Sequence, residues 1–313
     1  MIALIVGIAS QDGTYLAEFL LSKGYQVVGT IRSSGDASTF IPPQIIQEIA
    51  DLSDYASLEA VIKKYQPNEI YNLAAFSVSI DSWDKAYLAG QINALGPVLI
   101  LEAIRLHAPQ AKFFQASSRE IFGPVASGVA NENTPISPTN PYAISKSYAH
   151  FMTQCYRNTH GLFAVSGILF NHESPRRPDH FITRKITKAA ARIKVNSQEK
   201  LTLWNLNSPR DRGFAKEYVE AMWLMLQASN PKDYVIATGE LHTVADICDI
   251  AFSRVGLNYK DHLLLEPSPV PEVTDSVKGD ASLIKTDLGW SPKTNFKSLI
   301  ELMVDADLKN STS

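Results

Sequence analysis

Tyr142 and Lys146 lie four residues apart in a stretch with a helical pattern. Residues at positions i and i+4 share one face of a helix, so the two side chains can point into the same pocket. A phenol with a pKa of about 10 is a poor base at neutral pH, and a nearby ammonium stabilises the phenolate and lowers that pKa. The pair therefore predicts a base, Tyr142, that removes a proton from a substrate hydroxyl with the help of Lys146.

Ser118 and Glu120 follow an apolar run at 112–116 that is typical of a buried strand. The serine would supply a hydrogen-bond donor and the glutamate a second acid/base group. A tyrosine and a lysine at this spacing also occur in helices for packing and solvation alone. We favour catalysis because the helix pair comes together with this strand end and with a nucleotide-binding signature at the N-terminus.

The N-terminus has the order strand, turn, helix that a dinucleotide fingerprint requires. Residues 2–6 are aliphatic, residues 7–13 read GIASQDG, and a helical pattern follows. Turn glycines let the backbone approach a pyrophosphate at the helix N-terminus. Ser10 occupies the place of the usual middle glycine, where it either tightens the turn or donates a hydrogen bond, and a tight turn without a ligand is the alternative. The predicted cofactor residues in this turn are Gly7, Ser10, Gln11, Asp12 and Gly13.

The second predicted strand, 25–31, ends in Arg32 and Ser33. A carboxylate at this place would hold the ribose 2′-hydroxyl of NAD, whereas a cation and hydroxyls suit the 2′-phosphate of NADP. We therefore predict NADP rather than NAD, and the alternative is a solvated arginine at a strand end. Residues after the third and fourth predicted strands complete the predicted cofactor site, together with the helix pair: Asp51, Leu52, Leu73, Ala74, Ala75, Tyr142 and Lys146.

Strands alternate with helices throughout the first two thirds of the chain, which predicts an α/β fold with a doubly wound parallel Rossmann sheet. Ligands of such sheets bind beyond the carboxyl ends of the strands. Five candidate residues follow predicted strand ends: Gly7, Arg32, Asp51, Ala74 and Ser118. We therefore expect them to surround one cleft.

The chain becomes polar and interrupted by prolines after residue 170, and basic residues cluster there. Lys185 and Arg210 suit a diphosphate, whereas nucleic acid would need a longer basic stripe with exposed aromatic side chains. Ser77, after the fourth predicted strand, can reach the substrate. We expect two interleaved parts, an NADP-binding domain at 1–170 and 212–240 and a smaller α/β substrate-binding lobe at 171–211 and 241–313.

Composition limits the classes of partner. The chain has 313 residues, of which 45% are hydrophobic, and a net charge of -3 gives no reason to expect nucleic acid or an anionic membrane. Cys155 and Cys248 fit neither a disulfide framework nor a metal site, so we predict free thiols in the cytoplasm and no metal. We find no targeting signal and no apolar run of membrane-spanning length, so we expect no membrane span.

Several longer segments resemble one family over nearly the whole chain. They are QDGTYLAE at 11–18, QASS at 115–118, GILFNHESPRR at 167–177, TRK at 183–185 and YVEAMWLMLQ at 218–227. These segments are similar to those of the GDP-mannose 4,6-dehydratases, which are extended short-chain dehydrogenase/reductases. The resemblance implies a Rossmann enzyme that acts on a nucleotide sugar.

The resemblance also implies roles for particular residues. Ser118 takes the place of the family's catalytic threonine, while Glu120, Tyr142 and Lys146 match its glutamate, tyrosine and lysine. The implied substrate is GDP-mannose or a close relative such as a GDP-heptose, whose diphosphate would be held by Asn171, Lys185 and Arg210.

In the implied reaction Tyr142 deprotonates the 4-hydroxyl while hydride leaves C4. Glu120 then removes the C5 proton and protonates the departing 6-hydroxyl, and hydride returns to C6. Glu120 favours this reaction over a simple 4-epimerisation, although nucleotide-sugar decarboxylases can carry a similar Ser-x-Glu sequence. A GDP-sugar 4-epimerase, a 4-keto reductase and a nucleotide-binding protein without turnover are the alternatives.

The chain departs from the family pattern around the sugar site. Arg119 stands where the family has serine, Phe76 where it has glutamine, Arg212 where it has tryptophan, and Val270-Pro271 replaces an arginine-proline pair. An arginine beside Glu120 would weaken the glutamate as a general acid if the two side chains meet. The exact sugar is therefore the least determined part of the prediction.

A further departure concerns assembly. Ser33 replaces a second arginine of the family, and the loop that follows it is shortened. That loop contributes to tetramer formation in the family. We therefore expect a homodimer built on the helices that carry Tyr142 and Lys146, with a homotetramer as the alternative.

Overall fold

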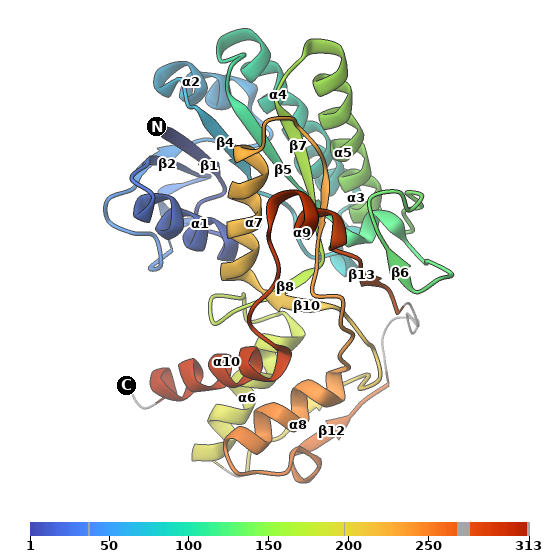
Figure 1. Ribbon diagram of the computed structural model, residues 1–313. Coiled ribbons are helices and arrows are strands. Elements are labelled where there is room, and N and C mark those ends of the chain that lie inside the picture. Colours follow the sequence, from blue (N-terminus) through green and yellow to red (C-terminus); the bar gives the residue numbers. More distant parts are fainter. Residues whose placement is uncertain (37, 197, 268–275, 312–313) are drawn as a thin grey trace.

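A parallel sheet of seven strands forms the centre of the larger lobe (Figure 1). The computed structural model describes residues 1–36, 38–196, 198–267 and 276–311. The strand order is β11-β7-β5-β4-β1-β2-β3. Their bounds are β1 (Ile2–Val6), β2 (Gln26–Ile31), β3 (Ile46–Ile49), β4 (Glu69–Asn72), β5 (Lys112–Ser118), β7 (Ala164–Leu169) and β11 (Tyr234–Ile236). The order reverses between β1 and β4, so the sheet is doubly wound, as predicted, and a crevice opens at that point.

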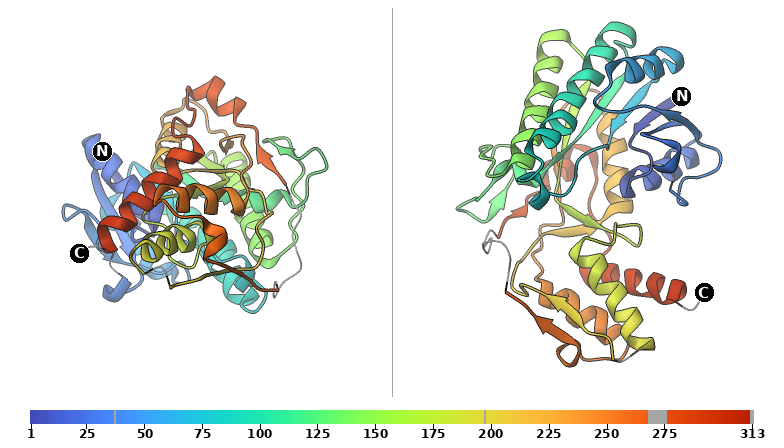
Figure 2. Two further views of the ribbon diagram at one scale, coloured as in Figure 1. Left: turned by 90° about the horizontal axis from the view of Figure 1, so that it is seen from below. Right: turned by 180° about the vertical axis from the view of Figure 1, so that it is seen from behind.

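Helices cover both faces of this sheet (Figure 1). One face carries α1 (Gln11–Ser22) and α7 (Ala215–Gln227), which pack against each other. The other face carries α2 (Tyr55–Tyr65), α4 (Gly96–His107) and α5 (Pro141–His160), seen from behind in Figure 2. With helices on both sides the central strands are buried on both faces, which explains why β1, β5 and β7 are nearly continuous apolar runs.

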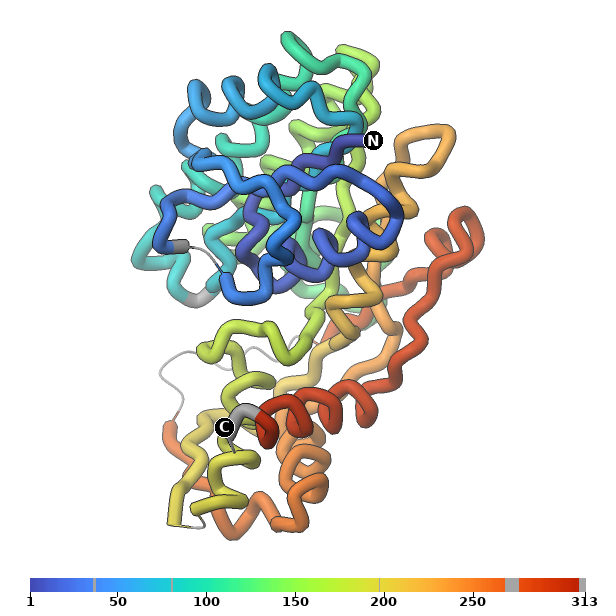
Figure 3. Tube along the Cα trace, turned by 90° about the vertical axis from the view of Figure 1, so that its left-hand side faces the viewer, coloured from blue at the N-terminus to red at the C-terminus, as the bar shows by residue number. Residues whose placement is uncertain are grey.

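The smaller lobe has a separate apolar core between three helices, α6 (Ile182–Val195), α8 (Val244–Arg254) and α10 (Phe296–Ser311). A short parallel pair, β9 (Leu201–Leu203) and β12 (Leu263–Leu265), lies beside them. Arg184 of α6 and Asp307 of α10 form a buried ion pair across this core. Figure 3 shows the segment around residue 175 running from the larger lobe toward α6.

Two short strand pairs join distant parts of the chain, and the sequence interpretation missed both. β8 (Asn171–Glu173) pairs with β10 (Arg212–Phe214), and β6 (Val129–Ala130) pairs with β13 (Lys278–Gly279). Strands of two or three residues are too short to show a periodic pattern. Their partners are also remote in sequence, so no local signal indicates the pairing. β13 and α9 (Ser282–Leu288) lie beside the central sheet, as the contact of α9 with β11 shows. Residues 278–288 therefore pack with the sheet lobe, not with the smaller lobe to which the interpretation assigned them.

Several short helical turns complete the fold, and most lie near the carboxyl edge of the sheet. They are η1 (Ser34–Asp36), η2 (Ile80–Ser82), α3 (Ala86–Ala89), η3 (Gly90–Leu95), η4 (Arg119–Phe122) and η5 (Tyr259–Asp261). η3 is a π-helix, a form that often occurs at functional sites. Together α3, η3 and α4 make one helical run, Ala86–His107.

The run Ala86–His107 corrects the expectation that no apolar segment reaches membrane-spanning length. It is long and apolar enough to cross a membrane by length and composition alone. However, 44% of its most apolar window is buried, and Ile100, Leu101 and Ile104 are fully buried in one core with α2 and the sheet. This pattern also fits a core helix, so the run is weak evidence for a membrane span.

Candidate active site

Ser10 closes the turn that leads into α1. Its hydroxyl accepts a hydrogen bond from Gly13 N at 3.0 Å and donates one to Gly7 O at 2.8 Å, so it caps the helix and tightens the turn. Gly7 has φ +88°, and a Cβ there would lie 2.8 Å from the backbone of Ala74. Only glycine fits this close approach of β1 to the end of β4. The turn therefore leaves its backbone open to a phosphate, as the fingerprint predicts.

A cavity of about 670 Å³ opens beyond the carboxyl ends of β1, β2 and β4. Its lining includes most predicted cofactor residues and one predicted substrate residue: Gly7, Ser10, Gln11, Asp12, Arg32, Asp51, Leu52, Leu73, Ala74, Ala75 and Ser77. Four predicted cofactor residues, Gly13, Ser33, Tyr142 and Lys146, are not part of the lining. A Cβ at Gly13 would lie 2.6 Å from Gly7 O, so this glycine is needed for the turn itself. Ser33 is an exposed residue beside the cavity.

Arg32 and Asp51 lie at neighbouring strand ends of this cavity. The Asp51 carboxylate accepts a hydrogen bond from Ser53 N at 2.7 Å and another from the Ser53 hydroxyl. These bonds, with a smaller contribution from the charge of Arg32, lower the pKa of Asp51 below its ordinary value. The carboxylate is therefore engaged in its own turn, while the exposed Arg32 borders the cavity where an adenosine would lie.

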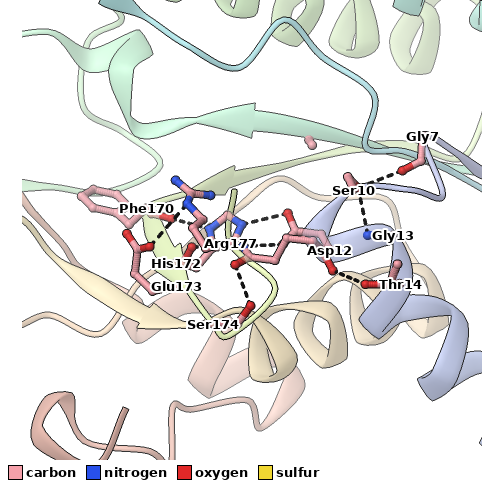
Figure 4. A network of polar contacts seen from close by, with 12 residues as sticks. Gly7, Ser10, Asp12, Gly13, Thr14, Phe170, His172, Glu173, Ser174 and Arg177 are labelled. Atoms are coloured by element: carbon pink, nitrogen blue, oxygen red, sulfur yellow. Dashed lines mark hydrogen bonds and ion pairs between the residues drawn. The ribbon is translucent and has the colours of Figure 1, made fainter. Parts of the chain in front are cut away.

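A buried network ties this turn to the start of the smaller lobe (Figure 4). His172 Nε2 lies 2.8 Å from Asp12 Oδ2, and His172 Nδ1 lies 2.8 Å from Phe170 O. Burial opposes both charges, but their mutual attraction prevails: the pKa of His172 is raised and the pKa of Asp12 is lowered. Gln11 and Ser174 add a second link, since Ser174 Oγ donates to Gln11 Oε1 at 2.7 Å. These contacts thus hold the cofactor turn in a fixed position relative to the start of the smaller lobe.

The charge on this pair makes the stability of the protein depend on pH. A histidine whose pKa is higher when folded contributes stability that is complete below its unfolded pKa of about 6.5 and is lost as pH rises through the folded pKa. We therefore expect the destabilisation caused by His172→Asn to be largest near pH 6 and smaller at pH 8.5. Urea unfolding of both proteins at the two pH values measures it. A destabilisation that does not change between them would contradict a charged His172.

The Tyr142 and Lys146 side chains lie on one face of α5, as predicted. Lys146 Nζ is 5.9 Å from the centre of the Tyr142 ring and donates a hydrogen bond to Ala116 O at 2.9 Å. Burial lowers the pKa of Lys146 to about 8. Burial also raises the pKa of Tyr142 to about 12, although a hydrogen bond with Ser118 works in the opposite direction.

The pKa of Tyr142 is therefore raised, whereas the sequence predicts that Lys146 lowers it. Desolvation of the phenolate is the largest cause, and the nearby charge of Glu120 raises the pKa of Tyr142 further. The ammonium of Lys146 donates to the strand carbonyl of Ala116.

Glu120 lies in η4, directly after the strand end that carries Ser118. Ser118 Oγ accepts a hydrogen bond from Glu120 N at 3.2 Å. Arg119 Nε lies 3.4 Å from Glu120 Oε1, and Asn140 Nδ2 donates to Glu120 Oε2 at 3.3 Å. The structure confirms that the arginine and the glutamate meet. Through Asn140, the N-cap of α5, the carboxylate of Glu120 is held at the start of the helix that carries Tyr142.

The residues predicted to hold the diphosphate lie at the junction of the lobes and in the smaller lobe, outside the lining of this cavity. Asn171 begins β8 and is in register with Arg212 of β10. Arg210 forms a backbone bridge with His242. Lys185 is exposed on α6, and its Nζ donates to Thr202 O at 2.7 Å. Asn171 follows Leu169, which is in register with Ser118 of β5, by two residues, whereas Lys185 lies on α6 of the smaller lobe.

Arg212, one of the departures from the family pattern, is buried at this junction. Its Nη1 donates to His242 O at 2.7 Å. Burial lowers the pKa of Arg212 to about 10, and the charge of Glu173 acts in the opposite direction. Arg212 is therefore a buried positive charge in β10, the strand that pairs with β8. The Val270-Pro271 departure falls outside the described residues.

The cavity is also lined by residues that the sequence analysis did not predict as site residues, among them Phe76, Arg177 and Phe181. Phe76 is fixed by the buried Asn93 of η3, which accepts from Phe76 N at 2.8 Å and donates to Phe76 O at 2.9 Å. Arg177 stacks on the Phe181 ring at 3.6 Å and lies 3.3 Å from Glu173. Arg177 closes the segment GILFNHESPRR, and the specificity of that segment was the signal that could have marked it. Across the described parts of the chain, no group of three His, Cys, Asp or Glu side chains could hold a metal.

The doubly wound sheet, the glycine turn, the strand-end serine and the Tyr-x-x-x-Lys helix define an extended short-chain dehydrogenase/reductase. The family model described as GDP-mannose 4,6 dehydratase matches residues 4–303. The chain therefore belongs to the GDP-mannose 4,6-dehydratase family.

Relatives and solved structures agree with this assignment. GDP-mannose 4,6 dehydratase 1 of Arabidopsis thaliana is 46% identical over 98% of this chain and 90% of its own length. The human GDP-mannose 4,6 dehydratase is 39% identical over 98% and 91%. Among solved structures, the UDP-glucose 4-epimerase of Thermus thermophilus in complex with NAD superposes with a TM-score of 0.89 at 25% identity, covering 98% of this chain and 99% of that one.

Proposed function

We propose that this protein is a nucleotide-sugar 4,6-dehydratase that converts GDP-mannose, or a close GDP-sugar such as a GDP-heptose, to the 4-keto-6-deoxy sugar. Its membership in the family and its similarity to curated GDP-mannose 4,6-dehydratases support the activity. The structural observation that carries the proposal is the place of Glu120: Asn140, the N-cap of the helix that carries Tyr142, donates to Glu120 Oε2 at 3.3 Å and so holds a second acid/base group beside that helix. A 4-epimerisation needs no such group.

A nicotinamide cofactor fits the cavity beside these groups. The glycine turn would hold the pyrophosphate, Asp51 and Leu52 would flank the adenine, and the small side chains of Ala74 and Ala75, with Leu73, would leave room beside β4. Arg177, from the second lobe, adds a cation to the lining. When bound, the oxidised nicotinamide supplies a hydride acceptor and a positive charge.

Tyr142 acts first in the proposed reaction. Once it has lost its own proton, the Tyr142 phenolate, hydrogen-bonded to Ser118, takes the proton of the 4-hydroxyl as C4 is oxidised to a ketone. The buried ammonium of Lys146, whose Nζ is 5.9 Å from the centre of the ring, stabilises the negative charge of the phenolate. Ser118 keeps the phenol oriented toward the sugar.

Glu120 acts second. The 4-ketone acidifies the C5 proton, which the carboxylate removes, and the electron pair of that C–H bond becomes part of an enolate. The C6–O bond then breaks, and Glu120 returns the proton to the hydroxyl, which leaves as water. Reduction at C6 and protonation at C5 complete the 4-keto-6-deoxy product, with no net change of the cofactor. Removal of a C5 proton by Glu120 distinguishes this sequence from the epimerase and reductase alternatives.

A panel of GDP-, UDP-, CDP- and dTDP-sugars tests the proposal. The protein is incubated with each sugar and oxidised cofactor, and products are identified by mass spectrometry. We expect GDP-mannose or a related GDP-sugar to lose one water without net formation of reduced cofactor. Turnover of UDP- or dTDP-sugars alone would overturn the substrate class, and net consumption of NADPH would indicate a reductase.

We also propose NADP as the cofactor, because Arg32 borders the cavity at the end of β2. A charge-assisted hydrogen bond contributes roughly 1.5–3 kcal/mol, which corresponds to about 10- to 100-fold in affinity. We expect Arg32→Ala to raise the Kd for NADP by about that factor and to change the Kd for NAD little. Calorimetric titration of both cofactors measures it. Arg254→Ala, which removes a surface ion pair with Asp305, is the control. Equal losses for both cofactors would contradict a 2′-phosphate contact.

A homodimer through α5 is the proposed assembly. Three apolar side chains, Ile144, Tyr148 and Phe151, are exposed at 56%, 43% and 47% along one side of this helix. Exposed apolar stripes of this kind mark contact surfaces. We expect a variant with Tyr148→Glu and Phe151→Glu to sediment as a monomer, whereas Leu302→Glu on α10 leaves the assembly intact. A wild-type protein that sediments as a monomer or tetramer would contradict the proposal.

Two further proposals concern organisation and location. We propose that residues 1–170 and 212–240 bind the cofactor and that the smaller lobe, formed by most of 171–211 and 241–313, binds the nucleotide sugar.

Cys155 and Cys248 are free thiols, one exposed and one buried, which supports a reducing compartment such as the cytoplasm.

A further inference from the structure

The backbone of Glu120 is fixed within η4. Glu120 N donates to Ser118 Oγ at 3.2 Å, and Gly123 N donates to Glu120 O at 3.1 Å. Gly123 has φ +59°, and a Cβ there would lie 2.1 Å from Ser137 O, so the end of this turn has no freedom to shift. A glutamate still has three side-chain torsions. The place of its carboxylate therefore depends on the groups that bind it.

Two side chains bind the carboxylate, one at each oxygen. Arg119 Nε lies 3.4 Å from Oε1, and Asn140 Nδ2 donates to Oε2 at 3.3 Å. Arg119 is 4% exposed, so water screens its charge little. The half-buried carboxylate is thus held between a buried cation and a neutral amide.

Asn140 has a second task that connects Glu120 to Tyr142. It is the N-cap of α5: its Oδ1 accepts a hydrogen bond from Ala143 N at 2.8 Å, and Pro141 follows as the first helical residue. The oxygen end of the amide thus fixes where the helix of Tyr142 begins, while the nitrogen end binds the Glu120 carboxylate. An aspartate or a serine can cap a helix equally well, but an aspartate has no N–H to donate and a serine side chain is shorter.

We propose that Asn140 is a positioning residue for proton transfer by Glu120, holding its carboxylate at a fixed place relative to Tyr142 so that the two groups act on neighbouring carbons of one sugar. This proposal rests on the proposed dehydratase function. Arg119 holds the other carboxylate oxygen from the buried side. The competing explanation is that Asn140 serves only to cap the helix.

Two substitutions separate positioning from capping. Asn140→Ser and Asn140→Asp both keep a cap acceptor, but both remove the N–H that binds Glu120. The matched control is Asn295, which precedes α10 and accepts from Ser298 N at 2.8 Å in the same cap geometry, far from the catalytic groups. Asn295→Ser therefore reports the cost of changing an asparagine cap alone.

Kinetics and structure are both measured. A misplacement of about 1 Å can cost on the order of 100-fold in rate, so we expect the Asn140 variants to lower kcat for dehydration by roughly 10- to 100-fold with KM nearly unchanged. Exchange of the C5 proton with solvent deuterium should fall by the same factor, while the transient formation of reduced cofactor is retained. Asn295→Ser should change none of these. Crystals of Asn140→Ser with bound cofactor should show α5 still beginning at Pro141 and the Glu120 carboxylate displaced.

The outcomes distinguish this proposal from the proposed function. An Asn140→Ser protein with normal C5 exchange and an unmoved carboxylate overturns the positioning role even if GDP-mannose is dehydrated. A wild-type protein that is inert toward GDP-sugars overturns the function, and a displaced carboxylate with an intact α5 still supports the role of Asn140. Equal losses in Asn140→Ser and Asn295→Ser reduce Asn140 to a helix cap.

Discussion

Tyr142→Phe is expected to abolish the first chemical step. The substitution keeps the ring and its packing and removes the group that accepts the proton of the 4-hydroxyl. General base catalysis contributes about 10²- to 10⁴-fold, so we expect kcat to fall by about 10³-fold. Because oxidation at C4 precedes everything else, no reduced cofactor should form transiently in single-turnover experiments, and no C5 exchange should occur.

A control on the same helix shows whether this loss is chemical. Tyr148 lies on the exposed side of α5, and Tyr148→Phe removes an equivalent hydroxyl six residues away. We expect its kcat to match that of the wild-type protein. Cofactor affinity should be similar in both variants, as measured by titration. A Tyr142→Phe protein with more than a tenth of the wild-type activity would mean that another group takes the proton.

Glu120→Gln is expected to separate the two halves of the reaction. Glutamine keeps the size of the side chain and a group for Arg119 and Asn140 to contact, but it cannot take the C5 proton. We therefore expect C4 oxidation to persist, with reduced cofactor accumulating at the active site, while water elimination falls by about 10²- to 10⁴-fold. Stopped-flow absorbance follows the first half, and product analysis follows the second.

The buried environment of Tyr142 determines the protonation state of its phenol. Burial raises the pKa of Tyr142 to about 12, so the phenol is protonated throughout the physiological range and has to lose its proton before it acts as a base.

A surface glutamate provides the control for the Glu120 experiment: Glu301→Gln on α10 should behave as wild type. If Glu120→Gln eliminates water at an undiminished rate, the enzyme is not the dehydratase that we propose.

The sequence was sufficient for the sheet and for most of the cofactor cavity because both follow from local patterns. Aliphatic runs ending in small or polar residues identified β1, β2, β4 and β5, and the carboxyl ends of parallel strands meet at one edge. Gly7 and Ala74, 67 positions apart, therefore lie in contact in the structure, as their places at strand ends imply.

Properties that arise from tertiary contacts were beyond a reading of the sequence. The pKa of Tyr142 depends on how deeply α5 is buried against β5, and the spacing to Lys146 carries no information on desolvation. The pair of Asp12 and His172 joins residues 160 positions apart through β8, a strand of three residues. The amide of Asn140 reaches Glu120 only because η4 folds back toward the start of α5.

The departures from the family pattern have different consequences. Arg119 lies in the catalytic centre and binds Glu120, whereas Arg212 is buried at the junction of the lobes and donates to His242 O. Phe76 faces the cofactor cavity with its backbone fixed by Asn93.

Transfer of label from C4 to C6 tests the dehydratase assignment most directly. GDP-mannose carrying deuterium at C4 is incubated with the protein and a catalytic amount of oxidised cofactor, and the product is examined by NMR and mass spectrometry. We predict a GDP-4-keto-6-deoxy sugar with the deuterium on C6, one solvent hydrogen on C5 and no net reduced cofactor. Deuterium that returns to C4, or that is recovered in released reduced cofactor, would contradict internal transfer and with it the proposed reaction.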